Sequence, residues 1–562
     1  MFSQLTDMEE ERGSRIRKAF SCYGIQRSVM KHLKTKDLKA LRLVDKCWME
    51  SALLPLKETS FVTLNSPSSI QNYLQFLQDS DFSAIFSNYK IVIKQSEFDS
   101  AQEACDSFNL FWSICSSYVK EISIALPWTC TFPILECIYQ TPPESMQLMK
   151  LTLSLDKIES SEDKWPEPEP IVQDKPVIPS QSSIPIPIIN SLISLSLNVS
   201  IVLSTEKKVF PFTWTDFFLK FPNICHLSIH SDYASGHFYR IVNILMEYQM
   251  RLKTLKIGTR DQRLFSEDFL KKLVLLTNNQ TEVLSLGFLP SVRHESGLDL
   301  MLSKSSTSLT HLSFLQYRTV NQATIISLTA SDGNTFPNLR SLRITKELVP
   351  HLQFLCKMPK IRRLEIYRDS TIGQHDDLSN PVIRTRSLPV ISTLQTLALE
   401  PFVPVEDVWK LVRWFPNLQR LQMKANDVIA RIIFMKWKEL RELYLVAEIT
   451  RDNNDIVRST LTDEGITGIS RNVLMQQFGA HCEKIDPVAN RSMPYIGDLT
   501  KLETCKLQVV PDYLTGLTDH SVHFGLANLP NLTSLTLVKS LVSPEAVELL
   551  RTQGVSVTVT MD

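Results

Sequence analysis

Hydrophobic residues along most of this chain follow one short pattern, L-x-x-L-x-L, which recurs between residues 119 and 537. Its last four positions alternate between polar and apolar residues and so predict a short strand with its leucines on one side. Most successive copies start about 22 to 33 residues apart, the period of leucine-rich repeats that hold a strand and a helix. The copies are Val119–Ile124, Leu148–Leu153, Leu192–Leu197, Ile224–Ile229, Leu252–Ile257, Thr281–Leu286, Leu309–Phe314, Leu339–Ile344, Ile361–Ile366, Leu394–Leu399, Leu418–Met423, Leu440–Leu445, Leu502–Leu507 and Leu532–Leu537.

The same turn phrase precedes four of these strands: Phe221-Pro222-Asn223, Phe336-Pro337-Asn338, Phe415-Pro416-Asn417 and Leu529-Pro530-Asn531. Proline ends the preceding helix, and asparagine suits the turn into the strand. A single repeat cannot bury its own leucines, so neighbouring repeats must stack and share a core. The predicted fold class is therefore α/β, a leucine-rich-repeat solenoid of the horseshoe type.

The solenoid is expected to span residues 61–562, and its first two repeats are irregular. Strands are predicted over Phe61–Leu64 and Tyr89–Ile93, with the helical stretch Ser69–Gln78 between them. Further predicted elements are helices over Asp268–Thr277 and Val405–Trp414, a helix from Ser543-Pro544 to Gly554, and a last strand over Val555–Val559.

Two segments interrupt the period. Residues 156–190 are rich in proline, which predicts an extended loop. Residues 446–498 separate two strands by roughly twice the normal spacing, which leaves room for a loop and for an unseen unit around Ile466–Phe478. Residues 176–205 carry no charge, but Leu192–Leu203 alternates with the period of a strand, so no membrane span is expected.

Residues 1–20 are predicted to be a charged, mobile tail, and two short helices are predicted within residues 21–60. Ile25, Val29 and Leu33 recur at i, i+4 and i+8 and so form an apolar stripe on the first helix. The second helix carries a stripe formed by Leu38, Leu41, Val44 and Trp48. About thirty residues cannot bury a core of their own, so another part of the chain or a partner must cover these faces.

The run Leu33-Lys34-Thr35-Lys36-Asp37-Leu38, followed by Leu41-Arg42-Leu43-Val44-Asp45-Lys46-Cys47-Trp48, resembles an F-box. The resemblance implies a small all-helical domain that docks onto a Skp-type adaptor and, through it, onto a cullin scaffold. The chain would then be the substrate receptor of an SCF-type ubiquitin ligase. The residues expected to form or support the adaptor surface are Ile25, Val29, Leu33, Leu38, Leu41, Val44 and Trp48.

The strand positions between the leucines are expected to face the concave side, where solenoids commonly bind partners. From Leu339 to Leu445 these positions are rich in arginine, lysine and tyrosine, side chains that adjacent strands would bring together. Glutamates among them make the surface mixed in sign, which favours a protein ligand over nucleic acid. The predicted substrate-binding residues are Arg343, Arg363, Tyr367, Arg420, Lys424 and Tyr444.

Composition and motifs limit the classes of function that are expected for this chain. The 60 basic and 60 acidic residues cancel, so the overall field does not attract nucleic acid. The ten cysteines include no C-x-x-C pair, and the N-terminus does not read as a signal peptide, which together fit a cytoplasmic or nuclear protein. His226 and His230 share one strand face without an evident third ligand. No phosphate-binding loop or catalytic motif occurs, so neither a cofactor, a metal nor an enzymatic activity is expected.

Two alternatives remain open from the sequence. In the first, the chain is a leucine-rich-repeat interaction scaffold whose F-box-like helices only cap the solenoid. The residues Ser21, Cys22 and Gly24 stand where an F-box usually opens with Leu-Pro, which supports this alternative. In the second, distant residues assemble an enzymatic site that no local motif reveals.

Overall fold

The structure is a computed structural model, and it divides into two compact units, residues 1–264 and 265–562, each described here by itself. The residues it describes are 29–30, 33, 35–41, 46–79, 86–92, 101–156, 188–199, 214–231, 236–248, 250–259, 267–287, 295–314, 335–367, 383, 388–451, 457–476, 493–509 and 516–560. The predicted tail at 1–20 and residues 157–187 of the predicted proline-rich loop lie outside this set.

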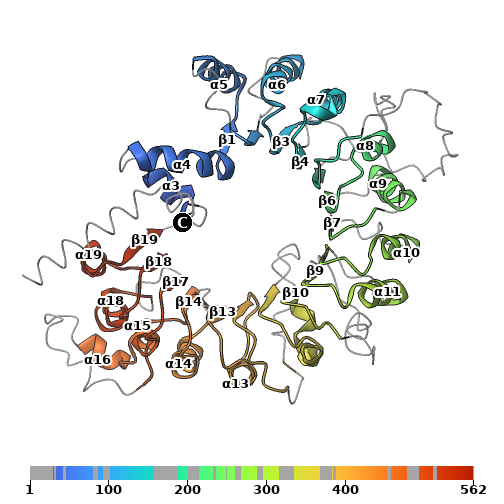
Figure 1. Cartoon of the computed structure of the whole chain (residues 1–562). Coiled ribbons are helices and arrows are strands. Elements are labelled where there is room, and N and C mark those ends of the chain that lie inside the picture. The colour runs from blue at the N-terminus through green and yellow to red at the C-terminus, as the bar shows by residue number, and fades with distance from the viewer. Residues whose placement is uncertain are drawn as a thin grey trace, which may run out of the picture. The chain divides into compact units, whose positions relative to one another are not determined.

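The first unit is a row of parallel strands, each paired with the next along the chain (Figure 1). Helices follow most of the strands and lie on one side of the row, so the unit has one helical and one strand-lined face. Its elements are α3 (Thr35–Leu41), α4 (Lys46–Thr59), β1 (Phe61–Leu64), α5 (Pro67–Asp79), β2 (Asn88–Val92), α6 (Ala101–Cys115), β3 (Glu121–Pro127), α7 (Trp128–Gln140), η2 (Pro143–Ser145), β4 (Lys150–Asp156), β5 (Ser194–Val199), α8 (Trp214–Lys220), β6 (His226–Ser231), α9 (Gly236–Glu247) and β7 (Thr254–Thr259).

The second unit repeats this arrangement, with parallel pairing from β8 to β19. Its elements are α10 (Glu267–Leu276), β8 (Val283–Leu286), α11 (Glu295–Ser305), β9 (His311–Phe314), β10 (Ser341–Thr345), η5 (Lys346–Lys357), β11 (Arg363–Tyr367), β12 (Thr396–Leu399), α13 (Val405–Trp414), β13 (Arg420–Ala425), α14 (Asp427–Lys436), β14 (Glu442–Ala447), β15 (Ile449–Arg451), β16 (Val457–Ser459), α15 (Asp463–Thr467), α16 (Arg471–Gln476), η7 (Ile496–Asp498), β17 (Thr504–Gln508), α18 (Asp519–Phe524), η8 (Leu526–Asn528), β18 (Ser534–Val538), α19 (Pro544–Thr552) and β19 (Ser556–Thr560). Each predicted strand corresponds to an observed one, so the prediction of an α/β leucine-rich-repeat solenoid is confirmed.

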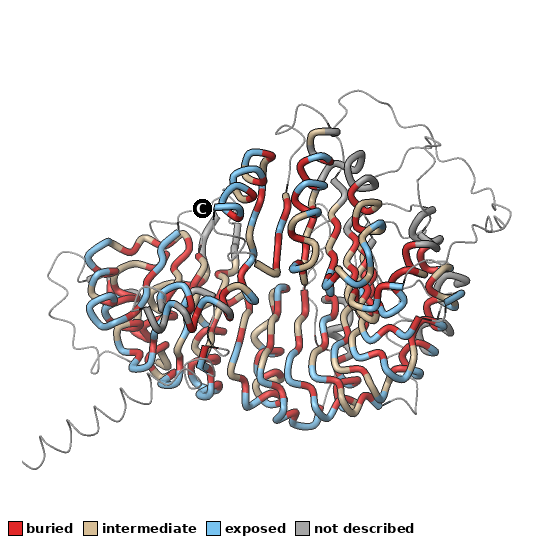
Figure 2. Tube along the Cα trace, turned by 45° about the horizontal axis from the view of Figure 1, so that its top comes forward, coloured by how far each residue is buried: buried red, intermediate tan, exposed pale blue. Residues whose placement is uncertain are grey.

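The core consists of leucine rows that run across the strands. Leu342, Leu364, Leu397 and Leu421 occupy the same register position on β10 to β13, and each is at most 2% exposed. Figure 2 shows buried positions recurring along the successive strands. Each repeat covers the leucines of its neighbours, which is why one repeat alone could not form this core.

The asparagines of the turn phrase have a common role. The side-chain amides of Asn338, Asn417 and Asn531 donate to backbone carbonyls of Thr307, Ser392 and Thr500 at 2.7, 3.2 and 2.7 Å. Asn223 makes the equivalent bond to Asn190 in the first unit, at 3.2 Å. Each asparagine thereby ties its turn to the turn of the preceding repeat.

The long interval at 446–498 is an insertion within one repeat. Strand β14 pairs directly with β17, so the described residues between them add no strand to the parallel row. They form the antiparallel hairpin β15–β16 and, around the place where an unseen unit was expected, the helices α15 and α16.

Aspartates at the first helical positions link the last helices of the second unit. Asp463 accepts hydrogen bonds from the amide and hydroxyl of Thr518 at 2.9 and 2.5 Å, and Asp519 accepts from the amide of Ser543 at 2.7 Å. Thr518 and Ser543 are themselves the N-cap residues of the helices that follow. A carboxylate in one helix thus fixes the N-terminus of the next.

Candidate functional site

The N-terminal helices enclose a very small core. Met30, Leu38, Ala52 and Leu56 are buried together, and Leu33 packs against them. Leu38 of α3 is only 1% exposed, because it is buried in one cluster with Ala52 and Leu56 of α4. Its side chain therefore holds the two helices together from inside.

The other predicted adaptor-binding residues are described to different extents. Val29 is 37% exposed, and Leu33 is partly buried. Leu41 and Trp48 lie in α3 and α4, and Ile25 and Val44 lie outside the described residues. The expectation that these residues bind an adaptor stays a prediction.

Two exposed apolar side chains on α4 were not predicted from the sequence. Met49 and Leu53 are each 39% exposed and stand one helical turn apart on one face. The predicted stripe ended at Trp48, whereas α4 continues through Pro55 to Thr59. The i, i+4 spacing of Met49 and Leu53 is the feature of the sequence that would have revealed them.

The end of α4 is hydrogen-bonded to the beginning of the strand row. The hydroxyl of Ser87 donates to the carbonyl of Lys57 at 3.1 Å, and the side-chain amide of Asn88 donates to that of Glu58 at 2.5 Å. Because Asn88 is the first residue of β2, the helix meets the strand row without a free linker.

On the second unit, Arg343, Glu365 and Arg363 form a group on the exposed face of β10 and β11. Arg343 faces Glu365 across the two strands, with 3.5 Å between Nε and Oε2, while Nε of Arg363 donates to Oε1 at 2.6 Å. Glu365 therefore contacts both arginines and neutralises only part of their charge.

The expected exposure of Tyr367 is not observed. Its side chain is buried, its hydroxyl donates to the carbonyl of Phe314, and the guanidinium of Arg343 lies 4.8 Å from its ring centroid. The ring thus acts from below as a support for Arg343.

The remaining predicted substrate-binding residues form a second group, on β13 and β14. Arg420 pairs with Glu442 at 3.0 Å, and the hydroxyl of Tyr444 contacts Oε1 of Gln508 at 2.6 Å. Lys424 is half-buried. The strand β12 lies between the two groups and presents Thr396 and Ala398, so the six residues do not converge on a single patch.

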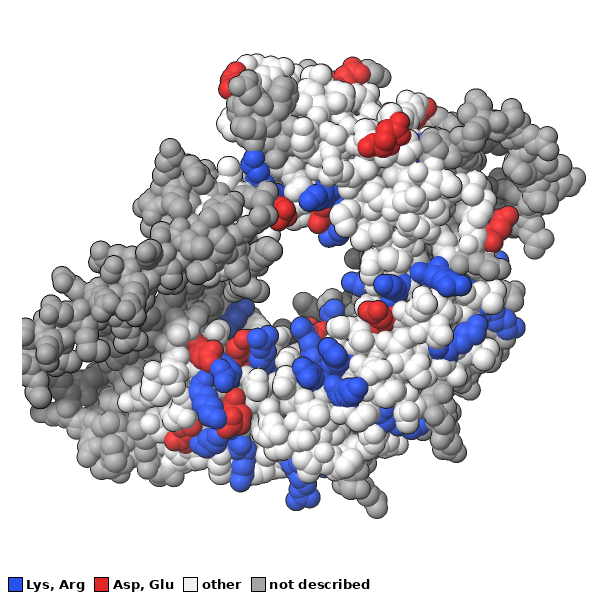
Figure 3. Space-filling view, in the orientation of Figure 1, with Lys and Arg blue, Asp and Glu red and all other residues white. Residues whose placement is uncertain are grey.

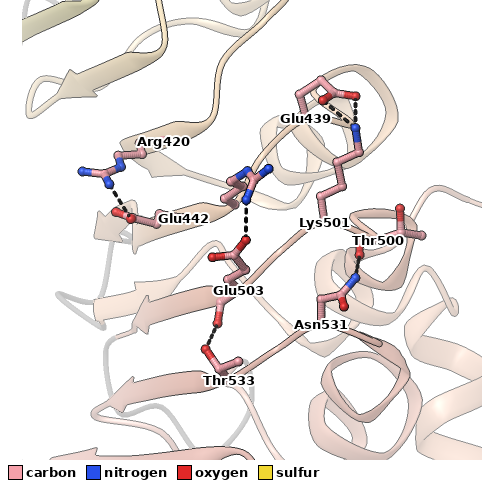
Figure 4. A network of polar contacts seen from close by, with 9 residues as sticks. Arg420, Glu439, Glu442, Thr500, Lys501, Glu503, Asn531 and Thr533 are labelled. Atoms are coloured by element: carbon pink, nitrogen blue, oxygen red, sulfur yellow. Dashed lines mark hydrogen bonds and ion pairs between the residues drawn. The ribbon is translucent and has the colours of Figure 1, made fainter. Parts of the chain in front are cut away.

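Further ion pairs between repeats lie near Arg420 and Glu442, as Figure 4 shows. Arg441 pairs with Glu503 at 2.7 Å, and Lys501 pairs with Glu439 at 2.6 Å. Nζ of Lys506 also lies 4.5 Å from the ring centroid of Tyr444. Since these pairs are exposed, each contributes at most about 1 kcal/mol to stability.

On the first unit, the strand face is polar and mostly neutral. Nδ1 of His226 lies 2.9 Å from Oγ1 of Thr254, and the ring of His230 occupies space that Gly258 leaves open. Among the described residues, no group of three or more His, Cys, Asp or Glu side chains could hold a metal ion. The described helices also include none that is long and apolar enough to cross a membrane.

No protein-family model matches the chain, and no curated protein matches it. Among solved structures, it is similar to the yeast Rad7–Elc1 complex, with 17% identity over 58% of this chain and 76% of that chain and a TM-score of 0.28. A leucine-rich-repeat protein of Leptospira interrogans is 12% identical over 93% of this chain and 94% of that chain, with a TM-score of 0.27.

Proposed function

We propose that this chain is the substrate-recognition subunit of an SCF-type ubiquitin ligase. The N-terminal helices bind a Skp-type adaptor and through it a cullin, and the face of the strand row binds a protein substrate. In this role the chain performs no covalent chemistry itself, because it holds the substrate for an enzyme bound elsewhere in the assembly.

The observation that carries the proposal is the apolar face of α4. Met49 and Leu53 are exposed, whereas Ala52 and Leu56 of the same helix and Leu38 of α3 are at most 2% exposed. Covering apolar surface contributes about 25 cal/mol per Å², so a partner that packs on this face gains free energy from both side chains. The face belongs to the same short segment that carries the F-box-like motif.

The connection between α4 and β2 supports the same role. A receptor must hold its ligand at a defined position relative to the adaptor. The bonds from Ser87 and Asn88 to the end of α4 provide a fixed connection, because they tie the helix directly to the strand row. The adaptor-binding helix is thereby anchored to the first repeats.

The test is co-purification of adaptor and cullin with the full chain. Replacing both Met49 and Leu53 by Glu is expected to abolish it, since each carboxylate would have to be desolvated in the interface. Leu300→Glu is the matched control, because Leu300 is an exposed helical leucine, 51% exposed, in α11 of the second unit. Adaptor binding that survives the double substitution would refute this assignment.

The second candidate function is a leucine-rich-repeat interaction scaffold. It is favoured by the same bonds between α4 and the beginning of β2, which suit a helix that caps the first repeats. If the unmodified chain retains neither adaptor nor cullin while other proteins bind its strand face, the scaffold function holds.

A further inference from the structure

The last strand of the second unit, β19, leaves its end of the core open. One row of core residues crosses the strands in register through Leu445, Leu507 and Leu537, each 0% exposed. The row continues to Val559 of β19, which is 36% exposed. In a solenoid each repeat covers the core of its neighbour, and no described strand of the second unit follows β19. Val559 is therefore a core position that no further repeat covers.

The end strand of the first unit shows that such a position can be buried. Leu64 of β1 lies in register with the buried Ile91 of β2 and is only 3% exposed. The exposure of Val559 is thus a property of β19 and is not shared by every end strand of this chain.

One edge of β19 has no strand partner among the described residues of the second unit. On its other edge β19 pairs with β18, and the amide of Ser556 donates to the carbonyl of Thr533 on that side at 2.9 Å. Backbone groups alternate in direction along a strand, so those of Val557 and Val559 point to the open edge. This edge can therefore form further backbone hydrogen bonds.

The strand lacks the features that usually protect an open edge. Proteins commonly block such an edge with a charged residue, a proline or a bulge. The sequence of β19, Ser-Val-Thr-Val-Thr, contains neither a charge nor a proline, and its register with β18 is continuous. Figure 3 shows acidic and basic side chains gathered on the second unit, and β19 contributes none of them. Nothing in the strand itself opposes pairing with another strand.

The sequence of β19 also matches itself when two copies run in opposite directions. Antiparallel pairing about Thr558 places Val557 of one copy opposite Val559 of the other, and Ser556 opposite Thr560. The valines have their backbone groups on the open edge, so they form the hydrogen-bonded pairs of the ladder, while Thr558 faces its own equivalent at the position where side chains lie closest. Pairs of β-branched residues and of hydroxyl residues are favourable across strands.

We propose that the open edge of β19 binds the same edge of a second copy of this chain and forms a two-fold symmetric dimer. Such a contact uses one surface patch twice, so the patch must be complementary to itself. The valine pairs continue the leucine core across the axis and remove the apolar surface of Val559 from water. The axis is perpendicular to the strands, so the helices of both second units lie on one side and their strand-lined faces on the other.

A strand of an unrelated protein fits this edge less specifically. Backbone hydrogen bonds at an open edge accept almost any extended segment. The order of valine and hydroxyl residues in β19, by contrast, gives like pairs at every position only when the strand meets itself. This match favours a second copy as the partner.

The experiment measures the mass of the full chain by sedimentation equilibrium over a range of concentrations. One chain has a mass of 64.3 kDa, and we expect the parent protein to reach twice this value. Thr558 is exposed, so Thr558→Lys and Thr558→Glu should leave the fold intact. Each should weaken self-association by about tenfold or more, because like charges then lie directly opposite one another.

An equimolar mixture of the two variants should associate again, because opposite charges then face each other across the axis. The matched control is Thr536→Lys, at the equivalent position on β18, which should associate like the parent. Association of the mixture would also show that both variants fold.

A mass of one chain at every concentration would overturn the proposal and would favour a strand of another protein as the partner of this edge. Undiminished association of Thr558→Lys, or an equal loss in Thr536→Lys, would place the contact elsewhere and would overturn it as well. A mixture that fails to associate would refute the pairing about Thr558. The assay uses no ligase subunit, so its result is independent of adaptor binding.

Discussion

Asp427 and Thr462, on neighbouring repeats, are joined through one carboxylate. Oδ1 of Asp427 accepts the amide of Thr462 at 2.8 Å, and Oδ2 accepts its hydroxyl at 2.7 Å. Gly465 makes this possible, because a Cβ at that position would lie 2.1 Å from Oδ1. Desolvation by burial raises the pKa of Asp427 to about 6, despite the opposing bonds from Thr462 and the attraction of Arg431.

This raised pKa predicts the sign of a pH dependence. The folded chain binds the proton on Asp427 more tightly than the unfolded chain does, so stability falls as the pH rises from about 4 to about 6. Asp427→Asn cannot ionise; its Oδ1 can still accept the amide of Thr462, and its Nδ2 can donate to the hydroxyl oxygen of Thr462 in place of the present bond. The variant should lose less free energy of unfolding between about pH 4 and 6 than the parent does. At pH 7 it should be more stable than the parent by about 1–2 kcal/mol, measured by urea unfolding across the pH range. An unchanged pH profile in the variant would contradict the assignment.

The turn asparagines should each contribute measurably to stability. Asn531→Asp preserves the shape of the side chain but removes the donor to the carbonyl of Thr500. The loss should be about 1 kcal/mol, the usual net value of a hydrogen bond, with some added repulsion between the two oxygens. Chemical denaturation at pH 7 measures it. Recovery at a pH where the new carboxyl is protonated would support the interpretation, and a variant as stable as the parent would refute it.

Truncating Leu38 and truncating Leu53 should destabilise the N-terminal helices to very different degrees. Leu38→Ala leaves a cavity between α3 and α4 and should cost about 2–4 kcal/mol, because Leu38 is 1% exposed. Leu53→Ala removes a 39% exposed side chain and should cost well under half as much. Hydrogen exchange of residues 46–59 reports local opening of α4. Equal protection in the two variants would show that the exposure of Leu53 has been misjudged.

Shortening the proline-rich segment should hardly affect the fold. Strands β4 and β5 pair in direct register, from Lys150 with Ser194 to Leu155 with Val199. The closure entropy of the loop between them depends only weakly on its length, so deleting residues 160–183 should change stability by about 1 kcal/mol or less. Thermal unfolding is the measurement, with the intact chain as reference. A much larger loss would mean that the deleted residues contribute packing.

The strands were predictable from the sequence because a leucine at each alternate position leaves little choice of which side is buried. The turn asparagines were equally visible, since proline and asparagine recur before four strands. Gly554 was expected to end the last helix, and it has a φ of +87°. These features depend on interactions within a repeat or between adjacent repeats, which the periodic sequence encodes directly.

The burial and the pairing of individual strand residues were harder to predict from the sequence. Tyr367 directly follows the buried Ile366 on its strand, and alternation alone places Tyr367 outside. It is buried because it reaches Phe314, two strands away, and lies beneath Arg343. The pairing of Arg420 with Glu442 could have been found by aligning repeats, because both open their strands. The hairpin β15–β16 has no counterpart among the described residues of the other repeats, so no period could indicate it.

The bonds of the turn asparagines each reach only one repeat back. Such links make the solenoid cooperative over short distances. A mutation in one repeat should therefore lower the local stability of that repeat and of its immediate neighbours only. Removing the bond from Asn531 should accelerate amide exchange in β17 and β18 while leaving β11 unchanged. Each repeat can then vary its exposed strand residues without disturbing distant ones, which makes the strand-lined face of such a chain easy to diversify.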